Sequence, residues 1–186
     1  MHLYKCLSQQ EVLLGNYSVS PIQRAEIEAI RIWRNAQIEV LRQKEQISQQ
    51  DQVLYFETNV WPTLNEDQPE QILFSYFKND VAIGYGGLVH INWDERSCEL
   101  SFLLNPQFTK NDEDYEEYLT RFISLMKSVA FGDLDFDKLF TETYAIRRFH
   151  ISVLEKCGFK HDRTMRSKVV IDNKSCDSLI HMILNM

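Results

Sequence analysis

The sequence has little glycine, no paired cysteines and no long apolar run. Only six of its 186 residues are glycine, and the densest group, Gly84–Gly87, opens no helix, so it does not indicate a phosphate-binding loop. The four cysteines lie far apart without a C-x-x-C pair, which predicts reduced thiols rather than a disulfide framework. No apolar stretch approaches the roughly 20 residues of a membrane span, so we expect no membrane contact.

The sequence also lacks a basic charge balance and clustered metal ligands. Its net charge of −7 argues against nucleic acid as the main partner, because such binders gain affinity from Lys and Arg on phosphates. The five histidines are scattered, so no metal site is predicted. The N-terminal residues Met1–Lys5 lead into polar residues without an apolar core, unlike a signal peptide. We therefore expect a cytoplasmic protein.

Apolar and aromatic residues, by contrast, are plentiful. Apolar residues make up 44% of the chain, and there are eleven Phe, eight Tyr and three Trp. Burial of this surface can outweigh the chain entropy that is lost on folding. Because no linker or repeat divides the chain, the sequence predicts one domain over residues 1–186.

The pattern of apolar residues predicts helices and strands in a definite order. The chain before Pro21 predicts one or two extended pieces, and Ile27, Ile30 and Trp33 predict a helix that continues past Ile38 to Leu41. A second helix is expected from Gln49 to Trp61, ended by Pro62. Three strands with short connections then predict an antiparallel meander. Their ranges are 71–78, 81–92 and 97–104.

The second half of the chain alternates strands and helices. Apolar spacings of three and four predict a long helix over 112–134, followed by a strand over 138–144. A further helix ends at Gly158, and a hairpin is expected through Asp172–Lys174. The whole pattern predicts an α+β fold with one mixed sheet of about six or seven strands flanked by helices.

Several local sequences in this order resemble the GNAT acetyltransferase superfamily. Residues 154–159 (L-E-K-C-G-F) resemble the end of the family's last helix, and 82–84 (A-I-G) resemble its central strand. Residues 98–102 (C-E-L-S-F) and 163–177 resemble the branch that acetylates ribosomal-protein N-termini. Residues 30–35 (I-R-I-W-R-N) resemble a helix of amino-sugar-nucleotide acetyltransferases. The resemblance implies transfer of an acetyl group from acetyl-CoA to a primary amine.

Three functions remain open at this point. The Trp33-Arg34-Asn35 helix favours a nucleotide-linked amino sugar as the acceptor, and a protein N-terminus of the ribosomal type is the alternative. A GNAT-shaped binding module without CoA-dependent activity is the third, because the turn over 106–114 contains no glycine and five carboxylates lie between Asp112 and Glu117. In that turn Asp112 is expected as the N-cap. We expect a monomer or homodimer.

The resemblance implies a CoA site around the same turn. The residues that we expect to contact CoA are Leu103, Leu104, Asn105, Lys110, Arg147, Arg148 and His150. Arg147 and Arg148 open a helix, where they could neutralise phosphates and offset the acidic turn. Arg147 and His150 stand where the family usually has Asn and Ser.

The remaining candidates concern the reaction and the acceptor. Glu99 is the candidate base, directly or through water, or else a salt-bridged strand carboxylate. Leu154 stands where many members carry the tyrosine that protonates the thiolate, so Tyr144 is proposed as the acid, although strand-end packing also explains it. Arg31, Trp33 and Arg34 could grip a nucleotide diphosphate, or form a solvated helix face. His90 could meet substrate or serve a structural role.

Overall fold

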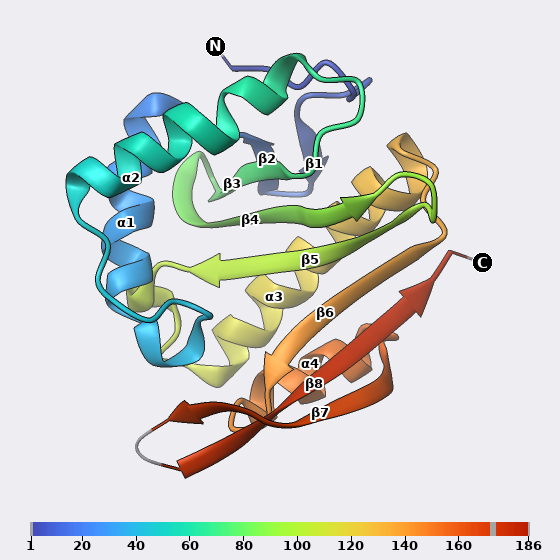
Figure 1. Ribbon diagram of the computed structural model, residues 1–186. Coiled ribbons are helices and arrows are strands. Elements are labelled where there is room, and N and C mark those ends of the chain that lie inside the picture. The colour runs from blue at the N-terminus through green and yellow to red at the C-terminus, as the bar shows by residue number, and fades with distance from the viewer. Residues whose placement is uncertain (1, 172–173, 186) are drawn as a thin grey trace.

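The computed structural model describes residues 2–171 and 174–185 (Figure 1). Twelve helices and strands make up its main elements, joined by short 3-10 and π-helical turns. In chain order they are β1 Val12–Leu14, β2 Tyr17–Pro21, α1 Ile27–Asn35, α2 Gln49–Tyr55, β3 Ile72–Lys78, β4 Val81–Asn92, β5 Ser97–Leu104, α3 Asp112–Lys127, β6 Lys138–Tyr144, α4 Arg148–Lys156, β7 Lys160–Ile171 and β8 Lys174–Leu184.

One mixed sheet runs through the described residues in the order β1-β2-β3-β4-β5-β6-β8-β7. All neighbouring strands are antiparallel except β5 and β6, which are parallel. The predicted α+β fold, the meander and the mixed sheet are confirmed. The sheet has eight strands instead of six or seven, since the stretch before Pro21 contributes two strands that pair with each other.

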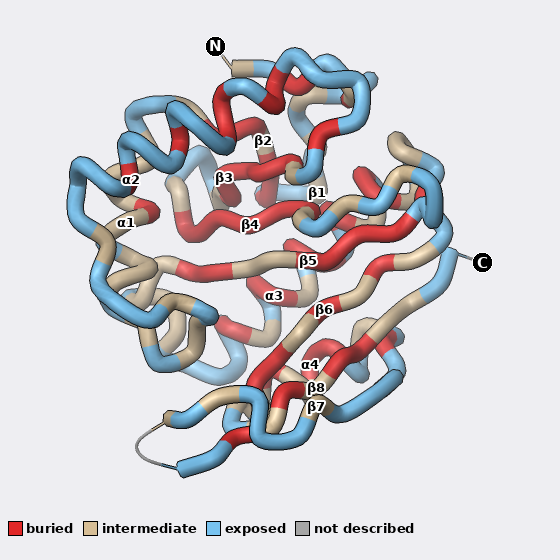
Figure 2. Tube along the Cα trace, in the orientation of Figure 1, coloured by how far each residue is buried: buried red, intermediate tan, exposed pale blue. Residues whose placement is uncertain are grey.

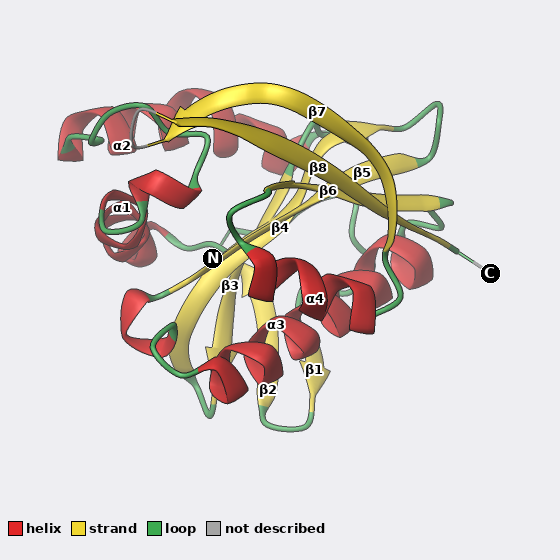
Figure 3. Cartoon of the chain, turned by 90° about the horizontal axis from the view of Figure 1, so that it is seen from below, coloured by secondary structure: helices red, strands yellow, loops and turns green. Residues whose placement is uncertain are grey.

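Helices cover both faces of this sheet, with α1 and α2 on one side and α3 and α4 on the other (Figure 3). The central strands β3 and β5 are buried along most of their length, and β4 is buried from Ile83 to Leu88 (Figure 2). On the α3 side, Phe102 of β5 packs on Phe122 with ring centroids 4.8 Å apart. On the α1 side, Arg34 donates to the hydroxyl of Tyr85 on β4 at 2.7 Å. Because Tyr85 pairs with Leu103 of β5, the successive residues Phe102 and Leu103 face different helical layers.

The helices of the first half end earlier than the sequence predicts. Helix α1 ends at Asn35, and Ile38–Val40 forms a separate 3-10 turn. The reason is Gln37, whose side-chain amide donates to the carbonyls of Trp33 and Leu104 and so turns the chain away. Helix α2 widens into a π turn after Tyr55. Pro62 begins a 3-10 turn, a position where its missing N–H costs nothing.

The second half follows the prediction more closely. The N-cap of α3 is Asn111 and not Asp112, because the Asn111 side chain accepts from the N–H groups of Glu113 (2.8 Å) and Asp114 (3.3 Å). The last predicted turn of this helix is π-helical, over Ser128–Asp133. Gly158, with φ +95°, follows α4 as predicted. Strands β7 and β8 pair antiparallel, while the predicted turn residues 172 and 173 lie outside the described part.

The two parallel strands separate in the middle of the sheet. Their pairing runs only from Ser97↔Lys138 to Glu99↔Phe140. Beyond that point β5 stays paired with β4 and β6 stays paired with β8, and the two arrows part in Figure 1. The chain thus opens the sheet at Glu99. Within the described ranges, no helix has the length and apolar composition needed to cross a membrane, and the cytoplasmic location stays a prediction.

Candidate active site

A narrow cavity of about 80 Å³ occupies the opening between β5 and β6. We call it the wedge cavity. Glu99 lies at its closed end, since Glu99 is the last residue of β5 that pairs with β6. Helices α3 and α4 contribute Leu119, His150 and Leu154 on one side, and the loop after α1 contributes Val40–Arg42 on the other. The cavity therefore passes through the sheet.

Two larger cavities adjoin the wedge cavity. The outer cavity, of about 480 Å³, shares Val40, Arg147 and His150 with it and lies between the starts of α3 and α4. The α1/α2 cavity, of about 380 Å³, shares Ser101 with it and lies between β4, α1 and α2. The wedge cavity can therefore be approached from both faces of the sheet, which suits a reaction between two substrates.

Glu99 is buried and salt-bridged at the closed end of the wedge. Its side chain is 5% exposed; Oε1 lies 2.6 Å from Nη2 of Arg42, and Oε2 lies 2.7 Å from Nδ1 of His90. Arg42 also contacts Glu142 of β6 at 3.2 Å, so its guanidinium joins carboxylates on the two parted strands. His90 sits at a bulge with φ 47° and its ring is 65% exposed. A chain of polar contacts thus links the wedge to the surface.

A second polar cluster lies at the junction of the wedge and outer cavities. The Tyr115 hydroxyl of α3 lies 2.7 Å from Nδ1 of His150, and Arg147 donates to the same hydroxyl at 2.9 Å. Burial, and then the charge of Arg147, lower the pKa of His150 well below its usual value. Burial also raises the pKa of Tyr115, while Arg147 opposes that rise. A neutral imidazole therefore accepts at Nδ1 from a protonated phenol.

The other acid candidate, Tyr144, also borders the wedge cavity. Its hydroxyl donates to the carbonyl of Leu41 at 3.4 Å, and burial raises its pKa. Leu154 is fully buried on the α4 side of the wedge and offers no proton. The structure thus brings together Glu99, Tyr144, Arg147 and His150 around one opening, and their roles in the reaction and in CoA binding stay predictions.

The acidic turn before α3 does not block this opening. None of the five carboxylates between Asp112 and Glu117 borders the wedge cavity, and Asp112 alone among them borders the outer cavity. Glu116 pairs with Lys156 at 2.7 Å, and Glu117 lies 3.8 Å from Lys78. Two of the five carboxylates are thereby directed at other elements.

The remaining expected CoA contacts occupy different positions. Arg148 borders the outer cavity, whereas Lys110 is exposed and borders neither it nor the wedge cavity. The side chains of Leu103 and Leu104 are buried in the core, so only their backbone could bind a ligand. The Asn105 N–H donates to Ile83 on β4 at 2.9 Å.

Acetyl-CoA fits this arrangement. Since strand N–H groups alternate in direction and that of Asn105 faces β4, those of Leu100 and Phe102 face the opening, as donors for an amide-containing arm. The narrow wedge suits an unbranched thioester arm. In the outer cavity, Arg147 and Arg148 are suited to bind phosphates.

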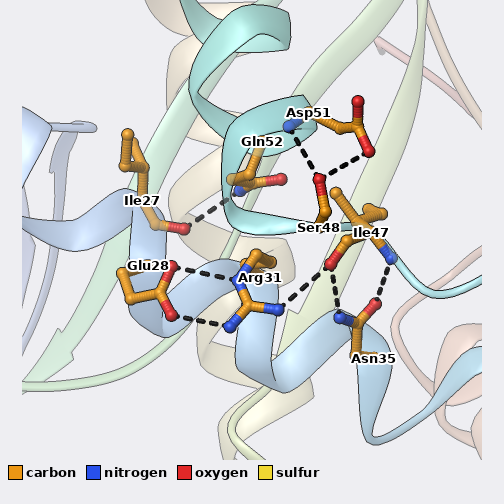
Figure 4. A network of polar contacts seen from close by, with 8 residues as sticks. All are labelled: Ile27, Glu28, Arg31, Asn35, Ile47, Ser48, Asp51 and Gln52. Carbon is orange, nitrogen blue, oxygen red and sulfur yellow. Dashed lines mark hydrogen bonds and ion pairs between the residues drawn. The ribbon is translucent and has the colours of Figure 1, made fainter.

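The predicted acceptor residues on α1 are largely engaged in internal contacts. Arg31 binds Glu28 through two nitrogens and donates to the carbonyl of Ile47, as Figure 4 shows. Asn35 bonds both the N–H and the carbonyl of Ile47. Arg34 borders the α1/α2 cavity, where its nitrogens bond Tyr85 and Gln43. Trp33 is half-buried against the core.

Sequence reasoning missed two residues of this site. Arg42 lies in an irregular loop and carries no local pattern that would reveal its partners 57 and 100 residues away. Tyr115 falls at a regular apolar position of α3, so the periodicity counts it as core. Its contact with His150 joins two helices and depends on how they pack.

Solved structures with the same fold are numerous. A spermidine N-acetyltransferase from Vibrio cholerae in complex with CoA and spermine has a TM-score of 0.78 and 15% identity, covering 92% of this chain and 96% of that one. A dodecameric structure of the same kind of enzyme from that organism has a TM-score of 0.74 and 16% identity, covering 92% and 95%. A spermidine/spermine N-acetyltransferase with manganese ions, from the same organism, has a TM-score of 0.72 and 15% identity, covering 91% and 93%. At such identities these likenesses show the fold alone.

The family comparison covers most of the chain. No curated protein sequence matches it. Residues 19–180 match the acetyltransferase (GNAT) domain family. This match confirms the predicted family, enzyme class and co-substrate, acetyl-CoA, and speaks against a binding module without activity. The predicted branch for ribosomal-protein N-termini and amino-sugar nucleotides is not supported by these comparisons. The chain belongs to the GNAT acetyltransferase family, whose enzymes move an acetyl group from acetyl-CoA to an amine.

Proposed function

We propose that this protein acetylates a small primary amine that carries positive charge. The observation that carries the proposal is the pair of carboxylates on the parted strands, Glu99 and Glu142, which hold the guanidinium of Arg42 between them. Both carboxylates are nearly buried, with side chains 5% and 11% exposed. Buried carboxylates need a cationic partner. Since Arg42 belongs to a surface loop and is 45% exposed, an ammonium group can take its place.

The two cavities that adjoin the wedge cavity allow acetyl-CoA and the amine to enter from opposite faces of the sheet. Acetyl-CoA enters from the outer cavity, where Arg147 and Arg148 lie, and its thioester reaches the wedge past His150. The amine enters from the α1/α2 face near Ser101. Glu99 then accepts the ammonium proton, directly or through water, so that the nitrogen can attack the carbonyl. Holding both partners in line contributes up to roughly 7–11 kcal/mol to lowering the barrier.

A di- or polyamine is the acceptor class to test first. Such a molecule presents one amine to Glu99 while a second charge remains for Glu142 or for Asp51 in the α1/α2 cavity. Structures that share this fold come from enzymes described as spermidine N-acetyltransferases, which supports the same class.

A nucleotide-linked amino sugar is the second candidate. It is favoured by Arg34, which lies on the wall of the α1/α2 cavity on the same helix as Trp33. The bonds of Arg31 to Glu28 and Ile47 weaken it, because they leave one arginine rather than two for a diphosphate. A protein N-terminus is the third candidate acceptor, and it is tested together with the other two. We also propose a monomer or homodimer, which light scattering tests.

The test is release of free CoA from acetyl-CoA with spermidine, an amino-sugar nucleotide and a ribosomal-type peptide. We expect the highest kcat/KM with spermidine. Glu99→Gln keeps the shape of the side chain but cannot take a proton, so we expect kcat to fall about 10²–10⁴-fold while CoA still binds. The control is Glu95→Gln, an exposed carboxylate in the turn before β5. An unchanged rate in Glu99→Gln removes Glu99 from the mechanism, and a preference for the sugar nucleotide rejects the cationic acceptor.

A further inference from the structure

Acetyl transfer leaves a thiolate, and the wedge cavity must supply a proton for it. The sulfur of the thioester lies on the side from which the arm enters, whereas the amine attacks the carbonyl from the other side. A donor for the sulfur is therefore expected where the outer cavity meets the wedge, away from Glu99 at the closed end. The ionisable residues that border both cavities are Arg147 and His150.

His150 has one ring nitrogen engaged and one available at this junction. The residue is 7% exposed, and Nδ1 is bonded to Tyr115. Nε2 makes no hydrogen bond to any residue in the described ranges, yet it is not sealed from solvent, unlike Nδ1 of His181. Since His150 borders both cavities and its Nδ1 is occupied by Tyr115, Nε2 is the ring nitrogen left to bind a ligand at the junction. We therefore consider Nε2 as the donor to the thioester sulfur.

The bonds around Nδ1 fix which ring nitrogen carries the proton. Arg147 can only donate, so the Tyr115 oxygen accepts a hydrogen bond from Arg147. The Tyr115 hydroxyl proton is then free to be donated to Nδ1 of His150. A neutral imidazole that accepts at Nδ1 carries its proton on Nε2. Tyr115 and Arg147 thereby hold the ring as a donor toward the junction.

We propose that His150 is the catalytic acid that protonates the departing CoA sulfur, with Tyr115 and Arg147 as its positioning residues. As the carbon–sulfur bond breaks, the sulfur keeps the electron pair and takes the Nε2 proton. Nδ1 then receives the Tyr115 hydroxyl proton, and Arg147 stabilises the tyrosinate. In all, the ammonium group gives up two protons, which pass through Glu99 to solvent. Solvent returns one proton to Nε2 of His150, and Nδ1 gives its proton back to Tyr115, so the donor is restored and the reaction releases one proton net. The inference rests on the proposed acetyl transfer in the wedge cavity.

The direct test is nitrogen NMR of histidine-labelled protein, which needs no turnover. In the free protein we expect His150 to show the Nε2–H form. Adding CoA should shift the His150 Nε2 resonance, whereas desulfo-CoA, which lacks only the sulfur atom, should shift it much less. Equal shifts with the two ligands would overturn the proposal, because Nε2 would then not sense the sulfur. Tyr115→Phe should broaden or change the tautomer signal, since Nδ1 loses its donor.

Kinetics test the role of the relay. We expect Tyr115→Phe and His150→Gln to lower kcat at least about 10-fold, within the range for losing an acid catalyst, with KM for acetyl-CoA nearly unchanged. Tyr118→Phe is the matched control on the same helix, since its ring packs on Phe108 and Tyr17, away from His150. Full activity in both His150→Gln and Tyr115→Phe overturns the proposal. A loss confined to Tyr144→Phe also overturns it and assigns the acid to Tyr144.

These outcomes separate the inference from the proposed acceptor. If the wild-type protein acetylates no amine in the panel while the sulfur-dependent NMR shift is present, the acceptor proposal fails and His150 keeps its assignment. If the protein acetylates spermidine but neither variant loses rate, only the inference fails.

Discussion

At the scale of single residues, Gly86 shows how closely the sheet and α3 pack. A methyl group at this position would overlap the carbonyl oxygen of Ser101 and lie 2.8 Å from Cζ of Phe122. The glycines of β4 therefore serve close packing, which agrees with the absence of a helix start after them. Gly86 and Gly87 lie directly beside Ser101, which borders the wedge cavity.

We predict that Gly86→Ala lowers the free energy of unfolding by about 1–3 kcal/mol, the usual range for overpacking. Gly132→Ala is the control, because a methyl group there meets no atom within 4 Å. Urea denaturation of both variants measures the difference. Equal stability of the two would show that β4 and β5 can separate freely at this point.

His150 should make the stability of the protein depend on pH. Its pKa is lowered from 6.5 by burial, by Arg147 and by His181, so the unfolded chain takes up the proton first as the pH falls. Above a pH of about 6.5, His150 is neutral in both states and its contribution to the free energy of unfolding is fully present. As the pH falls from there toward the lower folded-state pKa, the free energy of unfolding decreases by at most about 1.4 kcal/mol per pH unit. Tyr115, whose pKa is raised by burial, stays protonated over this range.

We predict that His150→Gln flattens this slope. Urea denaturation of wild type and variant between pH 7.5 and the acid limit of folding would show it. His181, whose pKa burial also lowers, leaves a residual slope in the variant. A His150→Gln curve parallel to that of the wild type contradicts the buried, neutral state of His150.

At the scale of elements, the loop between α1 and α2 is fixed in position by hydrogen bonds to α1. Arg31 and Asn35 bind the backbone of Ile47, and Gln52 of α2 donates to the carbonyl of Ile27 (Figure 4). This loop carries Arg42 into the wedge. The residues that resemble a substrate-binding motif thereby set the position of a loop that borders the site.

We predict that Asn35→Ala loosens the loop without unfolding the domain. Two hydrogen bonds to Ile47 are lost, which costs about 1–3 kcal/mol of local stability. Hydrogen exchange over residues 37–47 should become faster, and KM for the acceptor should rise. The exposed Gln46→Ala in the same loop is the control. Unchanged exchange in Asn35→Ala would show that other contacts hold the loop.

The elements themselves were largely predictable, and their ends were not. Amphipathic spacing located α3, and β-branched and aromatic runs located β3, β4 and β5, since both patterns reflect burial on one side of a regular backbone. The end of α1 depends on Gln37 reaching Leu104, a contact across 67 residues. No local pattern contains such a contact.

At the scale of the whole molecule, binding of acetyl-CoA should stabilise the fold. A ligand at 100 times its Kd adds about 2.7 kcal/mol. For a domain of this size that corresponds to a rise in Tm of roughly 5–10 °C. The nucleotide part alone, 3′,5′-ADP, should give a smaller rise, because it leaves the wedge empty. Calorimetry measures both. Equal shifts would place the arm outside the wedge, and no shift would remove acetyl-CoA from the site.

The sequence by itself determined the order of the elements, the mixed sheet and the family, because periodicity, glycine stops and short motifs are local. It also placed Glu99 and His150 on the elements that border the site. The tertiary structure decided which groups meet there. Arg42 reaches Glu99 and Glu142, and Tyr115 reaches His150, only because β5 and β6 part after Glu99 and two helices and a loop cover the opening. Such contacts join residues far apart in the chain, and they depend on packing that no single segment encodes.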